Sequence, residues 1–373
     1  MSCLYSLNIQ RSGQRYRCEL LTLPTFADLS EQWLSVENEA DNSFFLSWTW
    51  MHAWLEAIKP DAKLLRVYAQ EELVGIAFFV VKATRRGLAQ TLYLNQTGDE
   101  AKDQMWIEYN EVLAKTIQYE DVQSVSAEFI AREMQWDECR IGASKASSLQ
   151  TIAKHLQLPK HVAWETHTYG IVLQQASNYL DTLSRNTRYQ INRSFKQFMQ
   201  QGSELELKFA ESKAQALEYF EQAAPFHIKR WGDQPLESGF TNTYFLAFHH
   251  TLIDSAWSQD QVALARLQHA DEVLGYLYFF TYKGVVSFYL SGLAAAGNAK
   301  LKPGLCAHTL CVQHFKDLGF RYYDLMGGDD RYKHNLAVQK DLLQQVSFTK
   351  KTPVLAAEHF ARKVKNVLTG NKT

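Results

Sequence analysis

Cysteine is scarce in this chain and follows no metal-binding or disulfide pattern. The 373 residues include five cysteines, an odd number, at Cys3, Cys18, Cys139, Cys306 and Cys311. None of them forms a Cys-x-x-Cys pair, the spacing typical of zinc sites and redox motifs. We therefore expect reduced, mostly structural thiols and no bound metal.

Long apolar runs and an excess of charge of one sign are missing too. The longest apolar run, residues 73–81, is far shorter than the roughly 20 residues of a membrane-spanning helix. The first residues lack the apolar region of a signal peptide, so we expect a cytoplasmic protein. The formal net charge is −1, which argues against a surface built as a whole for nucleic-acid phosphate but allows a local basic patch.

The composition and the hydrophobic pattern predict an α/β protein of two domains. With 46% hydrophobic residues, the chain is long enough for two cores of ordinary size. Segments of strand type alternate with segments of helical periodicity. We expect a first strand and an arm within residues 1–24. We expect further strands at 63–69, 73–83, 90–94, 107–113, 138–141, 162–173, 205–209, 262–268, 273–282, 285–292 and 321–325. We expect helices at 26–37, 43–58, 120–133, 147–156, 183–200, 213–229, 243–255 and from 303 to 318.

The two halves of the chain repeat each other. Residues 71–80, EELVGIAFFV, correspond to residues 271–280, DEVLGYLYFF, at an offset of 200 positions. Each is an acidic turn followed by a strand, and the preceding strand and upstream helix fall in the same order. This pattern predicts a duplicated α/β domain with a boundary near residues 174–181.

The stretch from 287 to 336 carries the first chemical signal. It predicts a strand, a small-residue loop, a helix opening at Pro303 and Gly304, a short buried strand and a polar loop rich in glycine. A helix that begins after such a loop presents unpaired backbone N–H groups and a positive dipole end, which suit a pyrophosphate. A plain turn between strand and helix explains the same residues equally well.

Five motifs together resemble a known family. They are SFFLSWTWMHAWLEAI, LSRNTRYQINRSFKQF, DEVLGYLYFF, LKPGLCAH and YDLMGGDDRYKHNLA. In this order they resemble the CelD-like acyltransferases of the GNAT superfamily, which are similar to the Fem-type peptidyl transferases. The resemblance spans residues 44–337 and implies tandem GNAT-like domains, each a twisted mixed β-sheet flanked by helices. Residues 1–175 would form a degenerate N-terminal domain and residues 176–373 the acyltransferase domain.

The resemblance also implies where an acyl donor binds. A splayed strand would hydrogen-bond the pantetheine arm of acyl-CoA, and the loop before the helix would hold the pyrophosphate. The residues concerned are Tyr289, Leu290, Ser291, Lys302, Pro303, Gly304, Leu305 and Cys306. Leu301 stands where the family has Gln or Arg, and Cys306 where it has Gly or Ala. An acyl carrier protein is therefore an alternative donor to acyl-CoA.

Three residues near the end of the matched region are candidates for catalysis. Acyl transfer to an amine needs a neutral nucleophile and a proton source for the departing thiolate. Asp324, at the carboxyl end of a strand, is suited to take a proton from the acceptor ammonium or else to cap the glycine loop. Tyr332 is suited to protonate the thiolate, and Lys333 to hold phosphate or carboxylate.

Further polar residues are candidates for the acceptor site. They are His227, Arg230 and Trp231 at the end of a helix, Arg188 and Arg193 on a basic helix face shared with Arg185 and Lys196, and Asp329. His308, in the first turn of the helix after the loop, is a weaker candidate base. For the basic face, a solvated helix surface is the plain explanation.

We interpret the chain as an N-acyltransferase that moves an acyl group from a thioester donor to an amine, for example an amino sugar or a precursor of an envelope polysaccharide. The alternatives are a Fem-like transferase that uses aminoacyl-tRNA and a binding protein that retains the fold without activity. A basic amphipathic segment at 354–368 predicts either docking on the second domain or contact with a membrane surface.

Overall fold

The computed structural model describes residues 2–175, 178–294 and 301–353, so the segment 354–368 lies outside the described residues. The contacts divide these residues into two compact α/β units. Unit 1 comprises residues 2–48, 59–165 and 343–353, and unit 2 comprises 49–58 and 166–342. The two-domain boundary near residue 175 stays a prediction, because these units exchange segments. None of the helices in the described ranges has the length and apolar character needed to cross a membrane.

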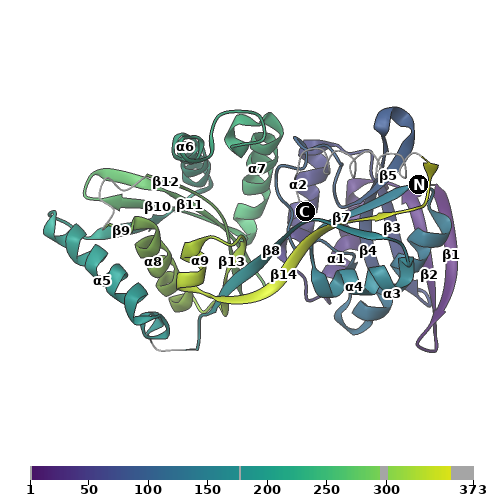
Figure 1. The fold of residues 1–373 in the computed structure, drawn as a ribbon, viewed down its shortest axis with the longest axis horizontal. Coiled ribbons are helices and arrows are strands. Elements are labelled where there is room, and N and C mark those ends of the chain that lie inside the picture. The colour runs from purple at the N-terminus through teal and green to yellow at the C-terminus, as the bar shows by residue number, and fades with distance from the viewer. Residues whose placement is uncertain (1, 176–177, 295–300, 354–373) are drawn as a thin grey trace, which may run out of the picture. The chain divides into compact units, whose positions relative to one another are not determined.

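Unit 1 is a mixed sheet with helices on its faces (Figure 1). Its neighbouring strands are antiparallel except for β5 and β7, which are parallel. In sheet order the strands are β1 (Cys3–Arg11), β2 (Gln14–Thr22), β3 (Lys63–Ala69), β4 (Glu72–Thr84), β5 (Ala89–Leu94), β7 (Glu138–Lys145) and the end of β14 (Val338–Thr349). The short β6 (Leu113–Ala114) pairs with β4. The helices are α1 (Phe26–Glu37), α3 (Tyr119–Glu133) and α4 (Ala146–Leu156).

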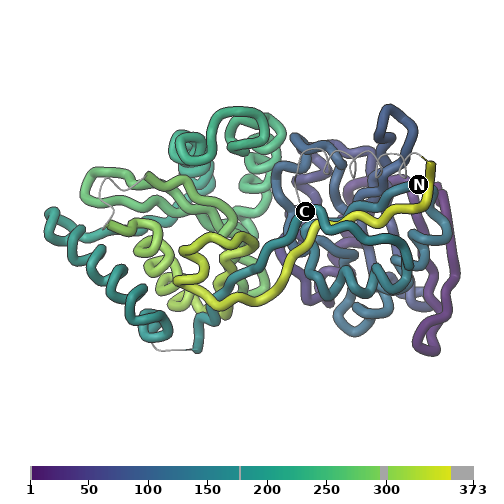
Figure 2. The backbone as a smooth tube through the Cα atoms, in the orientation of Figure 1, coloured from purple at the N-terminus to yellow at the C-terminus, as the bar shows by residue number. Residues whose placement is uncertain are grey.

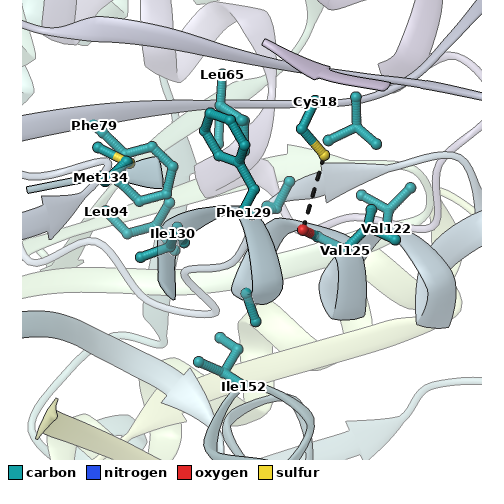
Figure 3. Packing of buried hydrophobic residues seen from close by; sticks show 14 of the residues in the cluster. Cys18, Leu65, Phe79, Leu94, Val122, Val125, Phe129, Ile130, Met134 and Ile152 are labelled. Carbon is teal, nitrogen blue, oxygen red and sulfur yellow. Dashed lines mark hydrogen bonds between the residues drawn. The ribbon is translucent and has the colours of Figure 1, made fainter. Parts of the chain in front are cut away.

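Both faces of the unit 1 sheet are covered because side chains alternate along each strand. Phe79 of β4 belongs to a core that includes Phe129 of α3 (Figure 3). In the same core the thiol of Cys18 donates a weak hydrogen bond to the carbonyl of Val125. Phe78, next to Phe79 in sequence, faces the other way and stacks on Trp33 of α1 with ring centroids 4.9 Å apart.

Unit 2 has the same plan (Figures 1 and 2). In sheet order its strands are β8 (Lys160–Val172), β13 (Tyr322–Gly327), β12 (Val285–Leu293), β11 (Glu272–Tyr282), β10 (Val262–His269) and β9 (Leu205–Phe209). Only the pair β12 and β13 is parallel. The helices are α2 (Trp48–Ile58), α5 (Arg185–Gln200), α6 (Lys213–Trp231), α7 (Thr243–Ala256), α8 (Pro303–Asp317) and α9 (Arg331–Leu336).

Helix α2 comes from the first part of the chain but packs in unit 2. Trp50 is 1% exposed and meets Phe248 of α7 edge-on, with ring centroids 4.7 Å apart. It also lies edge-on to Phe280 and Tyr289 of the sheet. The tryptophan-rich helix is therefore part of the core of unit 2.

The predicted repeat is confirmed by the pairing of its two hairpins. Val67 pairs with Gly75 and Leu267 with Gly275, at the same offset of 200. Both registers then shift at the next residue, Tyr68 in the first copy and Gln268 in the second. A one-residue shift of register moves every following side chain to the opposite face of the strand. Because both hairpins have the shift at the same position, their side chains face the two cores in the same way.

Two sequence predictions were wrong. Residues 107–112 form no strand, because the side chain of Asn110 rather than a sheet ladder satisfies the neighbouring carbonyls. The predicted polar loop after 325 contains the six-residue helix α9, which is too short to show a helical period. Its successor β14 was also missed, and residues 1–24 form two strands rather than one.

The parallel pair of each unit holds together over three residue pairs, and in unit 1 the space beyond them is filled. Asn110 is fully buried, and its amide donates to the carbonyls of Leu94 at the end of β5 and Gly142 of β7, at 2.8 and 2.9 Å. Its own oxygen accepts from Asn95 at 2.9 Å. The residues after β5 thus bridge the two strands.

Replacing Asn110 should therefore destabilise unit 1. We expect Asn110→Ala to lower the free energy of unfolding by about 3 kcal/mol, because two buried carbonyls and the Asn95 amide lose their partner. Asn8→Ala, at an exposed asparagine of β1, is the matched control and should change stability by no more than about 0.5 kcal/mol. Urea denaturation followed by circular dichroism compares them, and equal losses would contradict the bridging role.

Candidate active site

Strands β12 and β13 part from each other at one end, as the resemblance implied for the splayed strand. Their parallel pairs are Val285 with Tyr322, Val286 with Tyr323 and Ser287 with Asp324. Beyond Ser287, β12 continues to Leu293 along β11, whereas β13 continues along β8. We call this separation of the two strands the fork.

A pocket lies at the end of β12, where α6 packs closely on the strand. A Cβ atom on Gly292 would lie 2.5 Å from the carbonyl oxygen of Ala223, so only glycine allows this approach. The pocket has a volume of about 590 Å³. Its lining combines apolar side chains with two exposed cations and consists of Pro225, Phe226, Lys229, Arg230, Leu293 and Ala294. We call it the donor pocket.

Helix α8 begins beside this pocket. Leu293 lies 3.6 Å from the position that a Cβ on Gly304 would take. The backbone N–H of Lys302 donates to Ser194 of α5 at 2.7 Å, and Pro303 has no N–H. The N–H groups of Gly304 and Leu305 consequently have no partner within the helix, and the positive end of the helix dipole adds to the charge of Lys229 and Arg230.

Cys306 and Leu305 face the core instead of the pocket. Cys306 is fully buried, and its thiol contacts the backbone of Ile191 in α5. Burial raises the pKa of Cys306 to about 12, so the thiol stays protonated. Leu305 is 7% exposed and belongs to the same core. Their side chains therefore pack against the domain and do not line the loop.

On the proposed donor strand, Leu290 is buried, Ser291 is half-buried, and Tyr289 belongs to an aromatic cluster. The Tyr289 hydroxyl hydrogen-bonds Nε2 of His249 in α7 at 3.0 Å. Burial lowers the pKa of His249 well below its usual value, so this imidazole is neutral. The sequence analysis missed His249 because it lies among apolar positions of α7 and meets Tyr289 only in the folded chain.

A bend within β13, at Met326, organises the predicted catalytic residues. Met326 has a φ of 60°, in the left-handed region that bulky side chains avoid. Its N–H donates to Oδ1 of Asp324 at 2.8 Å, and the Lys333 ammonium donates to the carbonyls of Met326 and Gly327. Asp324 and Lys333 are both buried. In these contacts the two residues hold the bend.

Tyr332, the third predicted catalytic residue, stacks on His308 with ring centroids 5.3 Å apart. Burial and the nearby Asp330 raise the pKa of the Tyr332 phenol, so it stays protonated at neutral pH. The His308 ring is itself buried, and its Nδ1 hydrogen-bonds the hydroxyl of Tyr323 at 2.9 Å. Burial, followed by the charge of Lys333, lowers the pKa of His308 to about 3. The ring of Tyr332 therefore stacks on a neutral imidazole.

The structure places the predicted acceptor residues at different points of unit 2. Arg230, whose charge acts on Tyr332, lies over the ring of Trp231 at 4.9 Å, and Nδ1 of the buried His227 hydrogen-bonds Ser238 at 2.8 Å. Burial lowers the pKa of His227 to about 4. The structure does not bring the other candidates to the fork. Arg188 pairs with Asp181, Arg193 lies over Tyr189, and Asp329 accepts from Tyr169 of β8.

Comparisons with known proteins agree with this geometry. Residues 185–334 match the family model described as an acetyltransferase (GNAT) domain. The fold resembles the crystal structure of FemX, with a TM-score of 0.58 and 10% identity over 90% of this chain and 99% of that one. It also resembles L-PGS from Bacillus licheniformis, with a TM-score of 0.55 and 10% identity over 90% and 96% of the two chains. A conserved protein of unknown function from Bacteroides thetaiotaomicron gives a TM-score of 0.55 and 11% identity, over 88% and 98%.

A search of curated protein sequences finds no significant match. At these identities the structural likenesses show the fold alone. Together with the family match, which includes the fork, α8 and four of the six residues of α9, they define a fold of the GNAT acyltransferase type. No group of three His, Cys, Asp or Glu side chains that could hold a metal ion occurs in the part of the chain that the structure describes.

The buried histidine His308 should make stability depend on pH. Its pKa is about 3 in the folded protein and about 6.5 when exposed, so between these values the unfolded chain binds one more proton. Stability is therefore full above pH 6.5 and falls as the pH drops, by about 1.4 kcal/mol per pH unit for this one group. Urea denaturation between pH 7.5 and 5 measures the slope.

His308→Asn is the informative variant, because an asparagine oxygen can still accept from Tyr323 but does not titrate. It should lower stability at every pH, owing to lost packing, and reduce the slope by about one proton. Equal slopes for the wild-type and variant proteins would show that His308 is not the titrating group.

Proposed function

We propose that this protein is an N-acyltransferase that moves an acyl group directly from a thioester donor to an amine. The observation that carries the proposal is the separation of β12 from β13 in unit 2, with the donor pocket and the first N–H groups of α8 at the end of β12. The family match covers this region. The narrower likeness to the CelD-like branch, and an amino sugar as acceptor, stay predictions.

In this proposal the phosphate groups of the donor and its pantetheine arm contact different residues. Lys229 and Arg230 meet the phosphate groups together with the N–H groups at the start of α8. The apolar side chains of Phe226 and Leu293 cover the chain that leads to the thioester. The part of β12 beyond its pairs with β13 then offers its backbone to the amide groups of that chain. Acyl-CoA fits this division of charge, and acyl carrier protein presents the same phosphopantetheine arm.

The chemistry requires one proton to leave the amine and one to reach the sulfur. The amine nitrogen attacks the thioester carbonyl, a C–N bond forms, the C–S bond breaks, and the thiolate departs. Tyr332 is the proton donor for the thiolate, since its phenol is kept protonated beside the neutral His308. Asp324, the last residue of β13 paired with β12, is assigned to accept the proton of the amine.

Binding of the donor is the first test. In a thermal-shift titration, acyl-CoA at about a hundred times its dissociation constant should raise the stability by roughly 2.7 kcal/mol. Lys229→Glu should abolish the shift because it places a negative charge against the phosphates. Lys208→Glu, an exposed lysine on β9, is the matched control and should preserve it.

A thermal shift that grows with the length of the acyl chain would identify the class of donor. No shift with CoA, acetyl-CoA or longer acyl-CoAs would contradict acyl-CoA as donor. The same titration with acyl carrier protein and with aminoacyl-tRNA would then decide between the remaining donors. Binding of tRNA that weakens with salt and is lost in Arg185→Glu with Lys196→Glu, the exposed cations of α5, would establish the Fem-like alternative. Absence of any binding would favour the non-enzymatic alternative.

The second test separates catalysis from structure. Thiol release from acyl-CoA with glucosamine as acceptor should fall roughly 10²- to 10⁴-fold in Tyr332→Phe, which keeps the stack on His308 but lacks the hydroxyl. Asp324→Asn should cause a similar loss, although its amide oxygen can still accept from the Met326 N–H. If Asp324→Asn retains full activity while Asp324→Ala does not, the carboxylate only holds the bend and its proposed role as base is wrong.

A further inference from the structure

A second and larger pocket lies at the amino end of β13, away from the fork. It has a volume of about 820 Å³ and involves β8, the start of α5, α8 and the segment from α9 into β14. Its apolar wall includes Ile171, Leu173, Leu183, Val312 and Leu336. No residue that lines the donor pocket lines this one. Its volume is in the range of small-molecule sites.

The charged side chains that line this pocket are cationic, whereas Asp324 and Asp341 act on the lining residue Tyr322 from outside the lining. None of its lining residues is Asp or Glu, and the two that carry or can gain positive charge are His334 and Lys340. The Lys340 ammonium lies 4.4 Å from the ring centroid of Tyr322, which also lines the pocket. An apolar wall with a cationic rim is complementary to an amphiphilic anion.

A hydrogen-bonded chain fixes the imidazole of His334. The hydroxyl of Tyr169 lies 2.9 Å from Oδ1 of Asp329 and 3.0 Å from Nε2 of His334. Asp329 is held ionised, since the bond from Tyr169 lowers its pKa, and a carboxylate only accepts. The single hydrogen of the Tyr169 hydroxyl therefore goes to Asp329, and the Tyr169 oxygen accepts from Nε2–H of His334. Nδ1 remains for the pocket.

This arrangement prepares His334 to bind an anion. In a protonated ring Nδ1–H is a donor to the ligand, and the bond from Nε2–H to Tyr169 fixes the orientation of the imidazole. The nearby His167, 3.4 Å from Asp329, adds to the same network from β8. Lys340 supplies a second cation on the rim.

From these observations we propose that the pocket is a binding site for an amphiphilic anion, with an apolar body against Leu173 and Val312 and one anionic group between His334 and Lys340. The site does not depend on the acyl-transfer proposal, because it shares no residue with the donor pocket. Carboxylates, phosphate monoesters and sulfonates with a hydrophobic chain or ring share the chemistry that it recognises.

The test is calorimetric titration of the full chain at pH 6.5 with decanoate, decyl phosphate, decanol and inorganic phosphate. The two amphiphilic anions should bind at least roughly tenfold more tightly than either decanol or inorganic phosphate. Comparing decanoate with decyl phosphate identifies the preferred anionic group. Equal affinity for decanol and decanoate would overturn the proposal.

Variants locate the site. Lys340→Met should weaken decanoate binding roughly tenfold, and Val312→Trp, which fills the apolar wall, should abolish it, whereas Lys351→Met at an exposed lysine of unit 1 should have no effect. Lys229→Glu in the donor pocket should leave it unchanged. Circular dichroism confirms that each variant is folded. Decanoate binding that is lost in Lys229→Glu and kept in Lys340→Met would place the ligand in the donor pocket and refute the second site.

Tyr169→Phe tests whether the hydrogen-bonded chain from Asp329 through Tyr169 positions His334. It keeps the packing of the ring but removes the hydroxyl that joins Asp329 to His334, so decanoate should bind more weakly. Unchanged affinity for decanoate would show that the hydrogen-bonded chain does not position His334.

Discussion

The candidate active site depends on the buried ammonium of Lys333. Burying a cation is unfavourable unless its donors find acceptors, and here the carbonyls of Met326 and Gly327 provide them. Gly328 must lack a side chain, since a Cβ there would lie 2.9 Å from the ammonium. Together these contacts offset the strain of the left-handed Met326 and redirect the chain after Asp324. Tyr332 then reaches His308 because it precedes Lys333 on α9.

The two units show how one plan supports either a packed core or an open site. Their hairpins share a register, an irregularity and a parallel pair three residues long. In unit 1, Asn110 fills the space beyond the pair by bonding both strands, and no ligand can use that edge. In unit 2 the bend held by Lys333 leads β13 away, and α6 and α8 supply cations and N–H groups instead. The difference lies in the connecting segments, whereas the strands are alike.

The sequence predicted those parts of the structure that depend on local signals. Acidic turns before alternating apolar residues gave both hairpins, and Pro303 with Gly304 marked the start of α8. The roles of Asn110 and His249 were not predictable, because each side chain finds its partners across a gap in sequence and lies in an apolar context. The basic face of α5 was correctly placed on one helix, but its pairing of Arg188 with Asp181 requires the fold. For the same reason, the family resemblance assigned Cys306 to the loop although its side chain points into the core.

Helix α9 joins the two sites, although it has only six residues. Neighbouring residues of a helix point about 100° apart, so Lys333 and His334 necessarily contact different surroundings. Lys333 fixes the bend at the fork, whereas His334 turns toward Tyr169 and the larger pocket. A shift of α9 that relaxes one set of contacts therefore also disturbs the other. The ammonium of Lys333 is buried, and His334 bonds to the hydroxyl of the buried Tyr169. Small displacements of α9 are therefore unfavourable on both sides, and two independent networks constrain it to one position.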